Sequence, residues 1–125
     1  MTAALVSHSA RGRAGEQSAA AWLAAEGWEI LERNFRLRDG EIDIIASRQE
    51  VLAFVEVKCW SALPASALEY SIDYRKQARI VRAARVYLAR HPFLVARRPR
   101  FDVLFLDPAS GVVRHIEGAF EGGMD

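Results

Sequence analysis

The chain has few of the residues that disulfides and zinc sites require. Its 125 residues include one cysteine, Cys59, and three histidines, at positions 8, 91 and 115. One cysteine cannot form an intrachain disulfide or the cysteine pair of a redox or zinc motif, and the histidines show no ligand spacing. Metal chemistry in this chain would therefore depend on carboxylates, which favour hard cations such as Mg²⁺ or Mn²⁺.

Long hydrophobic runs are also missing from the sequence. No apolar stretch approaches the ~20 residues of a membrane-spanning helix, and residues 1–10 lack the features of a secretory signal. Hydrophobic residues make up 51% and charged residues 26% of the chain, which is typical of a soluble globular protein. We expect a cytoplasmic protein with no membrane association and a single domain over 11–120, between a flexible segment at 1–10 and a tail at 121–125.

Acidic residues are absent from one part of the chain. Nine basic and no acidic residues occur from Arg75 to Arg100, although the formal net charge is only +1. A basic cluster attracts polyanions such as nucleic acids. On charge alone, however, a solvated helix face is the preferred interpretation.

Hydrophobic patterning predicts the element order α-β-β-β-α-β-β. Gly27 is placed to end a first helix, Asp39-Gly40 is a two-residue hairpin signal, and Asp73 is a candidate N-cap for a second helix. The order favours an α/β domain with a central mixed sheet flanked by helices. The expected segments are helices at 11–27 and 74–90 and strands at 28–38, 41–46, 51–59, 101–106 and 112–116.

Charged residues of the two central strands are expected to meet. Glu56 and Lys58 lie two residues apart, so both point to the face of the third strand that carries its apolar residues Leu52 and Phe54. Buried charges cost several kcal/mol each unless they are paired or bind something. With a turn at 47–50, strand pairing sets Asp43 near Phe54 and one step from Glu56.

Alternation within the second strand gives a separate expectation. It places Ile42, Ile44 and Ala46 on one face and Asp43 on the other, together with Glu41 and Ile45. Nearer the C-terminus, Asp102 follows Arg100 closely and is expected to form structural ion pairs, and His115 is expected on a strand surface.

Two carboxylates and a lysine in this arrangement fit phosphodiester hydrolysis. Mg²⁺ is typically held by one or two carboxylates together with phosphate oxygens of the substrate, and it activates a water molecule. Lys58 would orient that water or neutralise the developing charge, and Glu16 in the first helix is a further candidate ligand. A plain cross-strand salt bridge is the alternative for Glu56 and Lys58.

Several segments resemble the bacterial YraN family over roughly residues 12–120. The resemblance implies a restriction-endonuclease-like fold, similar to archaeal Holliday-junction resolvases, with a nuclease core of the PD-(D/E)xK type. In that core Asp43, Glu56 and Lys58 match the motif, and Glu16 matches the glutamate of the first helix. The matching segments are Gly15-Glu16, Arg33-Asn34-Phe35, 40–46 (GEIDIIA), 54–58 (FVEVK), the helix bearing Lys76, and 100–103 (RFDV).

The resemblance implies a metal-dependent endonuclease that acts on branched or single-stranded DNA. Glu16, Asp43 and Glu56 would hold Mg²⁺ or Mn²⁺ and act with Lys58 as the catalytic residues. A resolvase cuts two strands symmetrically, so a homodimer is implied as well. Beside such a core, the basic residues of the second helix are candidate nucleic-acid contacts; these are Arg75, Lys76, Arg79 and Arg82.

The chain departs from the family pattern at two places. Ile42 stands where the motif has proline, and Cys59-Trp60 replaces the usual small-basic pair after the lysine. The missing basic residue favours an alternative function, a non-catalytic nucleic-acid-binding module on the same fold. The retained charges of Asp43, Glu56 and Lys58 favour the nuclease.

Overall fold

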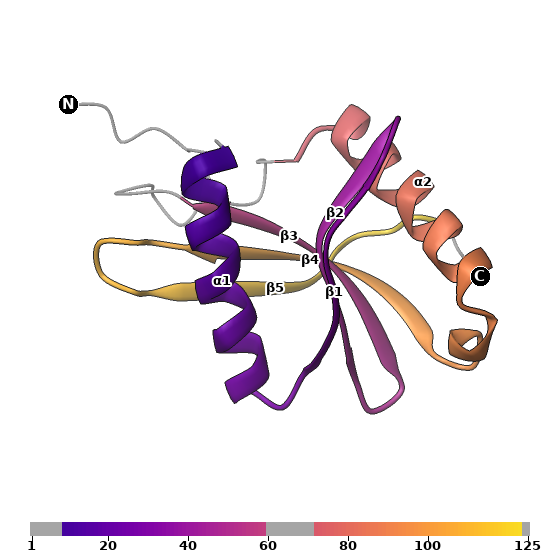
Figure 1. Cartoon of the computed structure of the whole chain (residues 1–125), viewed down its shortest axis with the longest axis horizontal. Helices are drawn as coiled ribbons and strands as arrows, with labels where there is room; N and C mark the ends of the chain where they lie inside the picture. The colour runs from indigo at the N-terminus through magenta and orange to yellow at the C-terminus, as the bar shows by residue number, and fades with distance from the viewer. Residues whose placement is uncertain (1–8, 60–71, 124–125) are drawn as a thin grey trace.

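The computed structural model describes residues 9–59 and 72–123 (Figure 1). It has a five-stranded sheet in the order β1-β2-β3-β4-β5, in which only β3 and β4 are parallel neighbours. The predicted order of helices and strands and the mixed sheet are confirmed. The elements are α1 (Ser9–Ala25), β1 (Glu29–Leu37), β2 (Gly40–Arg48), β3 (Val51–Cys59), α2 (Tyr74–Arg90), the 3-10 helix η2 (Pro92–Leu94), β4 (Arg98–Leu106) and β5 (Val113–Phe120).

The expected terminal segments are only partly described. Helix α1 begins at Ser9, two residues before the predicted start, and residues 1–8 and 124–125 lie outside the described residues. Residues 60–71, which include Trp60, lie outside them as well. Within the described part of the chain, no helix has the length and apolar character of a membrane span.

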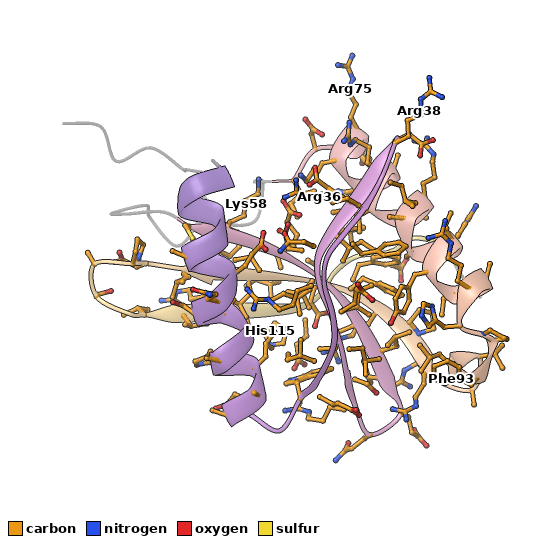
Figure 2. The ribbon with its side chains drawn as sticks, viewed as in Figure 1. Arg36, Arg38, Lys58, Arg75, Phe93 and His115 are labelled. Carbon is orange, nitrogen blue, oxygen red and sulfur yellow. The ribbon has the colours of Figure 1, made fainter. Side chains whose placement is uncertain are left out.

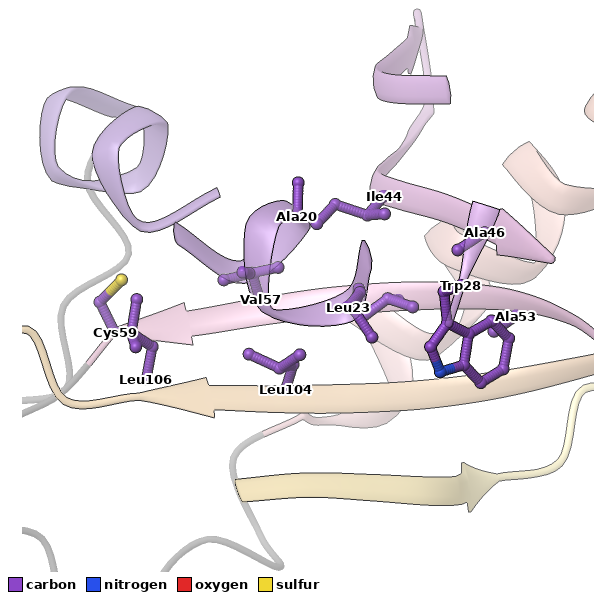
Figure 3. Packing of buried hydrophobic residues seen from close by; sticks show 12 residues of the cluster. Ala20, Leu23, Trp28, Ile44, Ala46, Ala53, Val57, Cys59, Leu104 and Leu106 are labelled. Carbon is purple, nitrogen blue, oxygen red and sulfur yellow. The ribbon is translucent and has the colours of Figure 1, made fainter. Parts of the chain in front are cut away.

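The two long helices cover opposite faces of the sheet (Figure 1). Helix α1 packs Ala19 and Leu23 against β2, β3 and β4, around Val55 and Leu104 (Figure 3). It approaches β3 so closely that a Cβ at Gly15 would overlap the Cys59 sulfur. On this face the buried cluster is rich in small side chains, which permits the short distance between helix and sheet.

Helix α2 covers the other face and supplies the crossover between the parallel strands β3 and β4. Asp73 caps the helix as predicted, accepting the Lys76 N–H at 2.9 Å. Its buried residues Ile80, Ala83, Ala84 and Tyr87 pack on a cluster that includes Phe54 and Phe101. Strand β3, covered by a helix on each face, is buried along nearly its whole length.

The β1–β2 hairpin turn differs from the prediction by one residue. Leu37 pairs with Gly40, so Arg38 and Asp39 form the turn and Gly40 is already the first residue of β2. Gly40 is required for another reason, because a Cβ there would lie 2.5 Å from the Arg79 carbonyl oxygen of α2. The glycine permits close approach of the hairpin to the helix.

The register of β2 against β3 corrects a second expectation. Arg48 pairs with Val51 and Ala46 with Ala53, so the turn is Gln49-Glu50 and not 47–50. The predicted position of Asp43 near Phe54 is therefore wrong by two residues. The observed register, continued one step beyond the last pair, places Asp43 opposite Glu56.

The hairpin also turns over along its length, which corrects the predicted alternation. Ile44 and Ala46 pack on the α1 face, whereas Ile42 packs on the α2 face with Ile45. The reversal occurs where Asn34 of β1 lies across from Asp43, between the pairs Arg33–Ile44 and Phe35–Ile42. Asn34 has a φ of 55°, in the left-handed region, which breaks the regular two-residue repeat.

Candidate active site

Asp43 lies where β2 separates from β3. The two strands pair as far as Ile44 and Val55, and beyond that point the hairpin bends toward α2 (Figure 1). The Val57 N–H of β3 therefore meets a carboxylate in place of a backbone carbonyl, and it donates to Asp43 Oδ2 at 2.8 Å. This bond fixes the Asp43 carboxylate at the division between the two faces of the sheet.

Glu56 is the buried carboxylate on the α2 side of Asp43. Its side chain is 3% exposed, and its Oε2 lies 3.4 Å from Lys76 Nζ and 3.7 Å from Lys58 Nζ. Among the described residues its Oε1 has no hydrogen-bond partner. Burial and the neighbouring Asp43 raise the pKa of Glu56 to about 8, against the opposing effect of the two lysines.

Glu16 is the corresponding carboxylate on the α1 side. It is buried, and its Oε1 also has no hydrogen-bond partner within the described part of the chain. Burial and Asp43 raise the pKa of Glu16 to about 7, whereas the nearby Asn34 side chain and the charge of Arg36 oppose this rise. The sequence could not orient Glu16, and the structure places it against the same aspartate as Glu56.

The structure thus brings the four predicted catalytic residues together. Asp43 contacts both glutamates, and Lys58, itself buried, lies beside Glu56. Lys76, predicted as a nucleic-acid contact, also belongs to this group through its pair with Glu56. Across residues 9–59 and 72–123, no three histidine, cysteine, aspartate or glutamate side chains stand in the arrangement of a formed metal site.

Sequence reasoning missed two residues of the site, Asn34 and Arg36. Both residues act to lower the pKa of Glu16, and Arg36 Nη2 donates to Asn34 Oδ1 at 3.5 Å. The pairing of the two hairpin strands could have identified Asn34 from the sequence. Counting outward from the Arg38-Asp39 turn places a polar asparagine directly across from Asp43.

The arginines of α2 that were predicted to contact nucleic acid differ in their surroundings. Arg79 lies 3.8 Å from Glu41, and Arg82 lies 3.7 Å from Asp39 and donates to the Asp39 carbonyl at 3.0 Å. These two arginines fasten the hairpin to the helix, and their predicted role in binding nucleic acid stays a prediction. Arg75 is exposed, with no ion pair among the described residues.

Four basic side chains, which we call the basic rim, lie at one end of the molecule; they are Arg36, Arg38, Lys58 and Arg75. In Figure 2, Arg36 and Lys58 lie between α1 and β2, and Arg38 and Arg75 point away from the sheet. Three of the four are exposed, whereas Lys58 is buried. The rim therefore extends from the carboxylates to the surface.

Asp102 belongs to a separate structural network, as predicted. Its fully buried carboxylate accepts two hydrogen bonds from Arg100 at 2.9 Å, one from the Gly118 N–H at 3.0 Å and a contact with His115 Nε2 at 2.8 Å. Burial alone would raise the pKa of Asp102, but these partners hold the pKa below its usual value. The expectation for His115 is wrong, because its ring packs edge-on to Trp22 and also contacts Asp102.

Part of the departure from the family pattern has a packing explanation. Cys59 is buried against Gly15 of α1, so the position after Lys58 requires a small side chain. Trp60, which stands in the place of the basic residue, lies outside the described residues.

Comparison with known proteins identifies the family. The model of uncharacterised protein family UPF0102 matches residues 15–106. A UPF0102 protein of Myxococcus xanthus is 40% identical over 115 residues, covering 90% of both chains. UPF0102 proteins of Frankia casuarinae and Alcanivorax borkumensis are each 46% identical, over 89% and 79% of this chain and 96% and 79% of their own. The chain therefore belongs to family UPF0102, in agreement with its resemblance to YraN.

Proposed function

We propose that this protein is a metal-dependent nuclease whose site is formed by Glu16, Asp43, Glu56 and Lys58. The observation that carries the proposal is the pair of orphaned oxygens, Glu16 Oε1 and Glu56 Oε1, buried on either side of Asp43. Three neighbouring carboxylates in a poorly hydrated place are costly, and a bound cation offsets that cost.

The donor set fits a hard divalent cation. All three groups are carboxylates, which Mg²⁺ and Mn²⁺ prefer, and their two orphaned oxygens flank the fixed Asp43. The raised pKa values of Glu16 and Glu56 indicate that these groups hold protons near neutral pH without metal. Metal binding would replace those protons, because carboxylates ligate in their ionised form.

Each residue of this site would then have a definite role. Asp43, fixed by the Val57 N–H, would hold the metal together with Glu16 and Glu56. A bound Mg²⁺ or Mn²⁺ supplies an acidified water and charge stabilisation at a phosphate. Lys58, buried beside Glu56, would donate hydrogen bonds to the attacking water or to a phosphate oxygen. Lys76 stabilises the ionised form of Glu56 from the α2 side.

The proposed substrate is a nucleic acid, DNA in preference to RNA. The basic rim offers several cationic side chains from the site outward, and such a cluster attracts a polyanion. Branched or single-stranded DNA is the substrate class that the resolvase resemblance favours. Symmetric cutting of a junction requires a homodimer, so a monomeric sedimentation profile with and without branched DNA would argue against resolvase chemistry.

A cleavage assay tests the proposal. Purified protein is incubated with labelled single-stranded, duplex, flap and four-way-junction DNA, with Mg²⁺ or Mn²⁺ or with chelator. Glu56→Ala is the inactive variant, and Glu29→Ala, at an exposed position of β1, is the matched control. Metal-dependent cutting that only Glu56→Ala loses supports the nuclease. Salt-sensitive binding without cutting in all three proteins supports the binding module instead.

A further inference from the structure

A groove, which we call the α2 groove, runs along one flank of helix α2. Tyr74, Ala78, Val81 and Arg85 follow one another at intervals of three or four residues, so they form one stripe of the helix, and all four line the groove. The opposite wall is the segment after β5, where a Cβ at Gly122 would lie 2.9 Å from Val81 Cγ2. The hollow between the two walls has a volume of about 520 Å³. Its shape suits an extended chain that lies along the helix.

Tyr74 presents an exposed aromatic ring at the start of the α2 groove. The residue is 86% exposed, although it is the first residue of a helix whose other face is buried. Among the described residues, its ring packs on no other aromatic ring. Exposed aromatic rings next to cationic side chains are the surfaces on which unpaired nucleic-acid bases stack.

The charge of the α2 groove favours an anionic occupant. Arg85 is exposed and has no ion pair within the described part of the chain, and Arg82 also lines the groove, although it pairs with Asp39. Glu121 is the acidic residue of the described lining, so the arginines outnumber it. The groove therefore combines net positive charge with the apolar surface of Ala78 and Val81.

The polar group beside the aromatic ring suits a nucleic-acid base. Gln77 lines the α2 groove next to Tyr74, and its Nε2 donates to the Ile72 carbonyl oxygen at 3.2 Å. That hydrogen bond orients the amide and leaves its oxygen as an acceptor for the amino or imino group of a base.

We propose that the α2 groove binds a single strand of nucleic acid, with one base stacked on Tyr74 and a phosphate beside Arg85. As a route to cleavage, this inference rests on the proposed function, because it names an unpaired strand as the form of substrate that reaches the site. Lys76, which lies 3.4 Å from Glu56 Oε2, is two residues from Tyr74. The Tyr74 end of the groove is therefore within one helical turn of a residue that contacts the carboxylates.

A duplex does not use this combination of surfaces. Its bases are stacked and paired in its interior, so only its phosphates and groove edges would meet α2. An unpaired strand exposes base faces that can cover the Tyr74 ring and the apolar lining while its phosphates meet the arginines. The α2 groove is therefore expected to distinguish single strands from duplexes.

Binding measured without metal tests the aromatic contact. Fluorescence anisotropy gives the affinity for a short labelled oligothymidylate and for a duplex of the same length, with chelator present so that neither is cut. We expect Tyr74→Ala to bind the single strand about tenfold more weakly and the duplex as the wild type does. Tyr74→Phe keeps the ring and should bind both like the wild type. Phe93→Ala removes a ring that is 76% exposed but lies outside the groove, and it is the matched control.

The two charged residues of the α2 groove should act in opposite directions on single-strand binding. Arg85→Ala removes a phosphate contact and should lower the slope of log affinity against log salt by about 0.7. Glu121→Gln removes a repulsive charge and should strengthen binding. Thermal melts of each variant establish that these exposed substitutions leave the fold intact.

The outcomes separate the α2 groove from the proposed nuclease. A wild-type protein that does not bind the single strand, wild-type affinity in Tyr74→Ala, or an equal loss on single strand and duplex would overturn the groove and leave the cleavage site untouched. Single-strand binding that depends on Tyr74, in a protein that cuts no DNA with Mn²⁺, would support the groove and overturn the nuclease.

Discussion

The Asp43 carboxylate accepts the Val57 N–H at 2.8 Å, at the point where β2 and β3 stop pairing. The bond gives a buried backbone donor of β3 its partner, and it fixes the group that touches both Glu16 and Glu56. The same side chain therefore contributes to sheet structure and to the proposed chemistry. Substitutions of Asp43 that preserve one contribution and remove the other can separate the two.

Asp43→Asn is expected to keep the fold and lose the metal. The amide oxygen can still accept the Val57 N–H, and loss of the charge relieves repulsion with both glutamates. We expect a Tm equal to or above that of the wild type at pH 8, with Mn²⁺ affinity reduced more than about tenfold. Asp43→Ala leaves the N–H without a partner and should cost about 1–3 kcal/mol of stability. Thermal melts and metal titration of both variants check this, and unchanged Mn²⁺ affinity in either would contradict it.

The metal-free protein is expected to lose stability as pH rises. The folded-state pKa values of Glu16 and Glu56, about 7 and about 8, lie above their usual value of 4.5, so the native state holds more protons than the unfolded state between these limits. Their contribution to stability is fully present below pH 4.5 and is lost between pH 4.5 and about pH 8, by several kcal/mol in total. Denaturant unfolding at several pH values with chelator measures this. A Glu16→Gln/Glu56→Gln variant should show a flat profile between pH 6 and pH 9.

Divalent cations are expected to reverse that loss. A ligand that binds only the native state adds about 2.7 kcal/mol at a concentration one hundred times its Kd. Mn²⁺ or Mg²⁺ should therefore raise the Tm at pH 8 and release protons into a weak buffer. Thermal melts at increasing Mn²⁺ concentrations test this in the wild type and in Glu56→Gln. An equal rise in both proteins would exclude Glu56 as a ligand.

The basic rim is expected to set the salt dependence of nucleic-acid binding. Each phosphate contact contributes about 0.7 to the slope of log affinity against log salt for single strands and about 0.9 for duplex DNA. Arg38→Ala and Arg75→Ala should each lower the slope by about that amount. Arg114→Ala, at an exposed position of β5, is the matched control. Identical slopes in all four proteins would remove the rim from the binding surface.

The Asp102 network is expected to govern acid stability without affecting the site. The pKa of Asp102 is held below its usual 3.8, so its contribution is present above that pH and is lost as pH falls through the folded-state value. Asp102→Ala leaves Arg100 and His115 without their buried partner and should cost about 3 kcal/mol. Acid titrations followed by circular dichroism compare the two proteins. Loss of Mn²⁺ affinity in a folded Asp102→Ala protein would show that the networks are coupled.

The sequence was sufficient for the order of helices and strands and for Glu56 and Lys58, because these depend on local signals. Their spacing of two residues in an apolar strand fixes a common face, whatever the neighbouring strands do. Asp73 was likewise recognisable as a cap from its position before a helical pattern. These properties can therefore be predicted from short segments of the sequence.

The remaining features of the site depend on backbone conformation and packing, which the hydrophobic periodicity of the sequence does not predict. The left-handed φ of Asn34 reverses the facing of the hairpin, so regular alternation predicted one face for Ile42 and Ile44, which lie on opposite faces. The register of β2 followed from a two-residue turn at Gln49-Glu50 that has no glycine to mark it. The direction of Glu16 depends on how α1 packs at Gly15.

Asp43 lies between the two hydrophobic layers, so the site is complete only when both helices have packed on the sheet. Glu16 belongs to α1 and Lys76 to α2, whereas Asp43 and Glu56 belong to the sheet between the two helices. A chain with only one layer packed would carry an incomplete set of ligands and charges. Cation binding at this seam would therefore couple the two layers into one cooperative unit, and a partly folded chain would bind the cation more weakly.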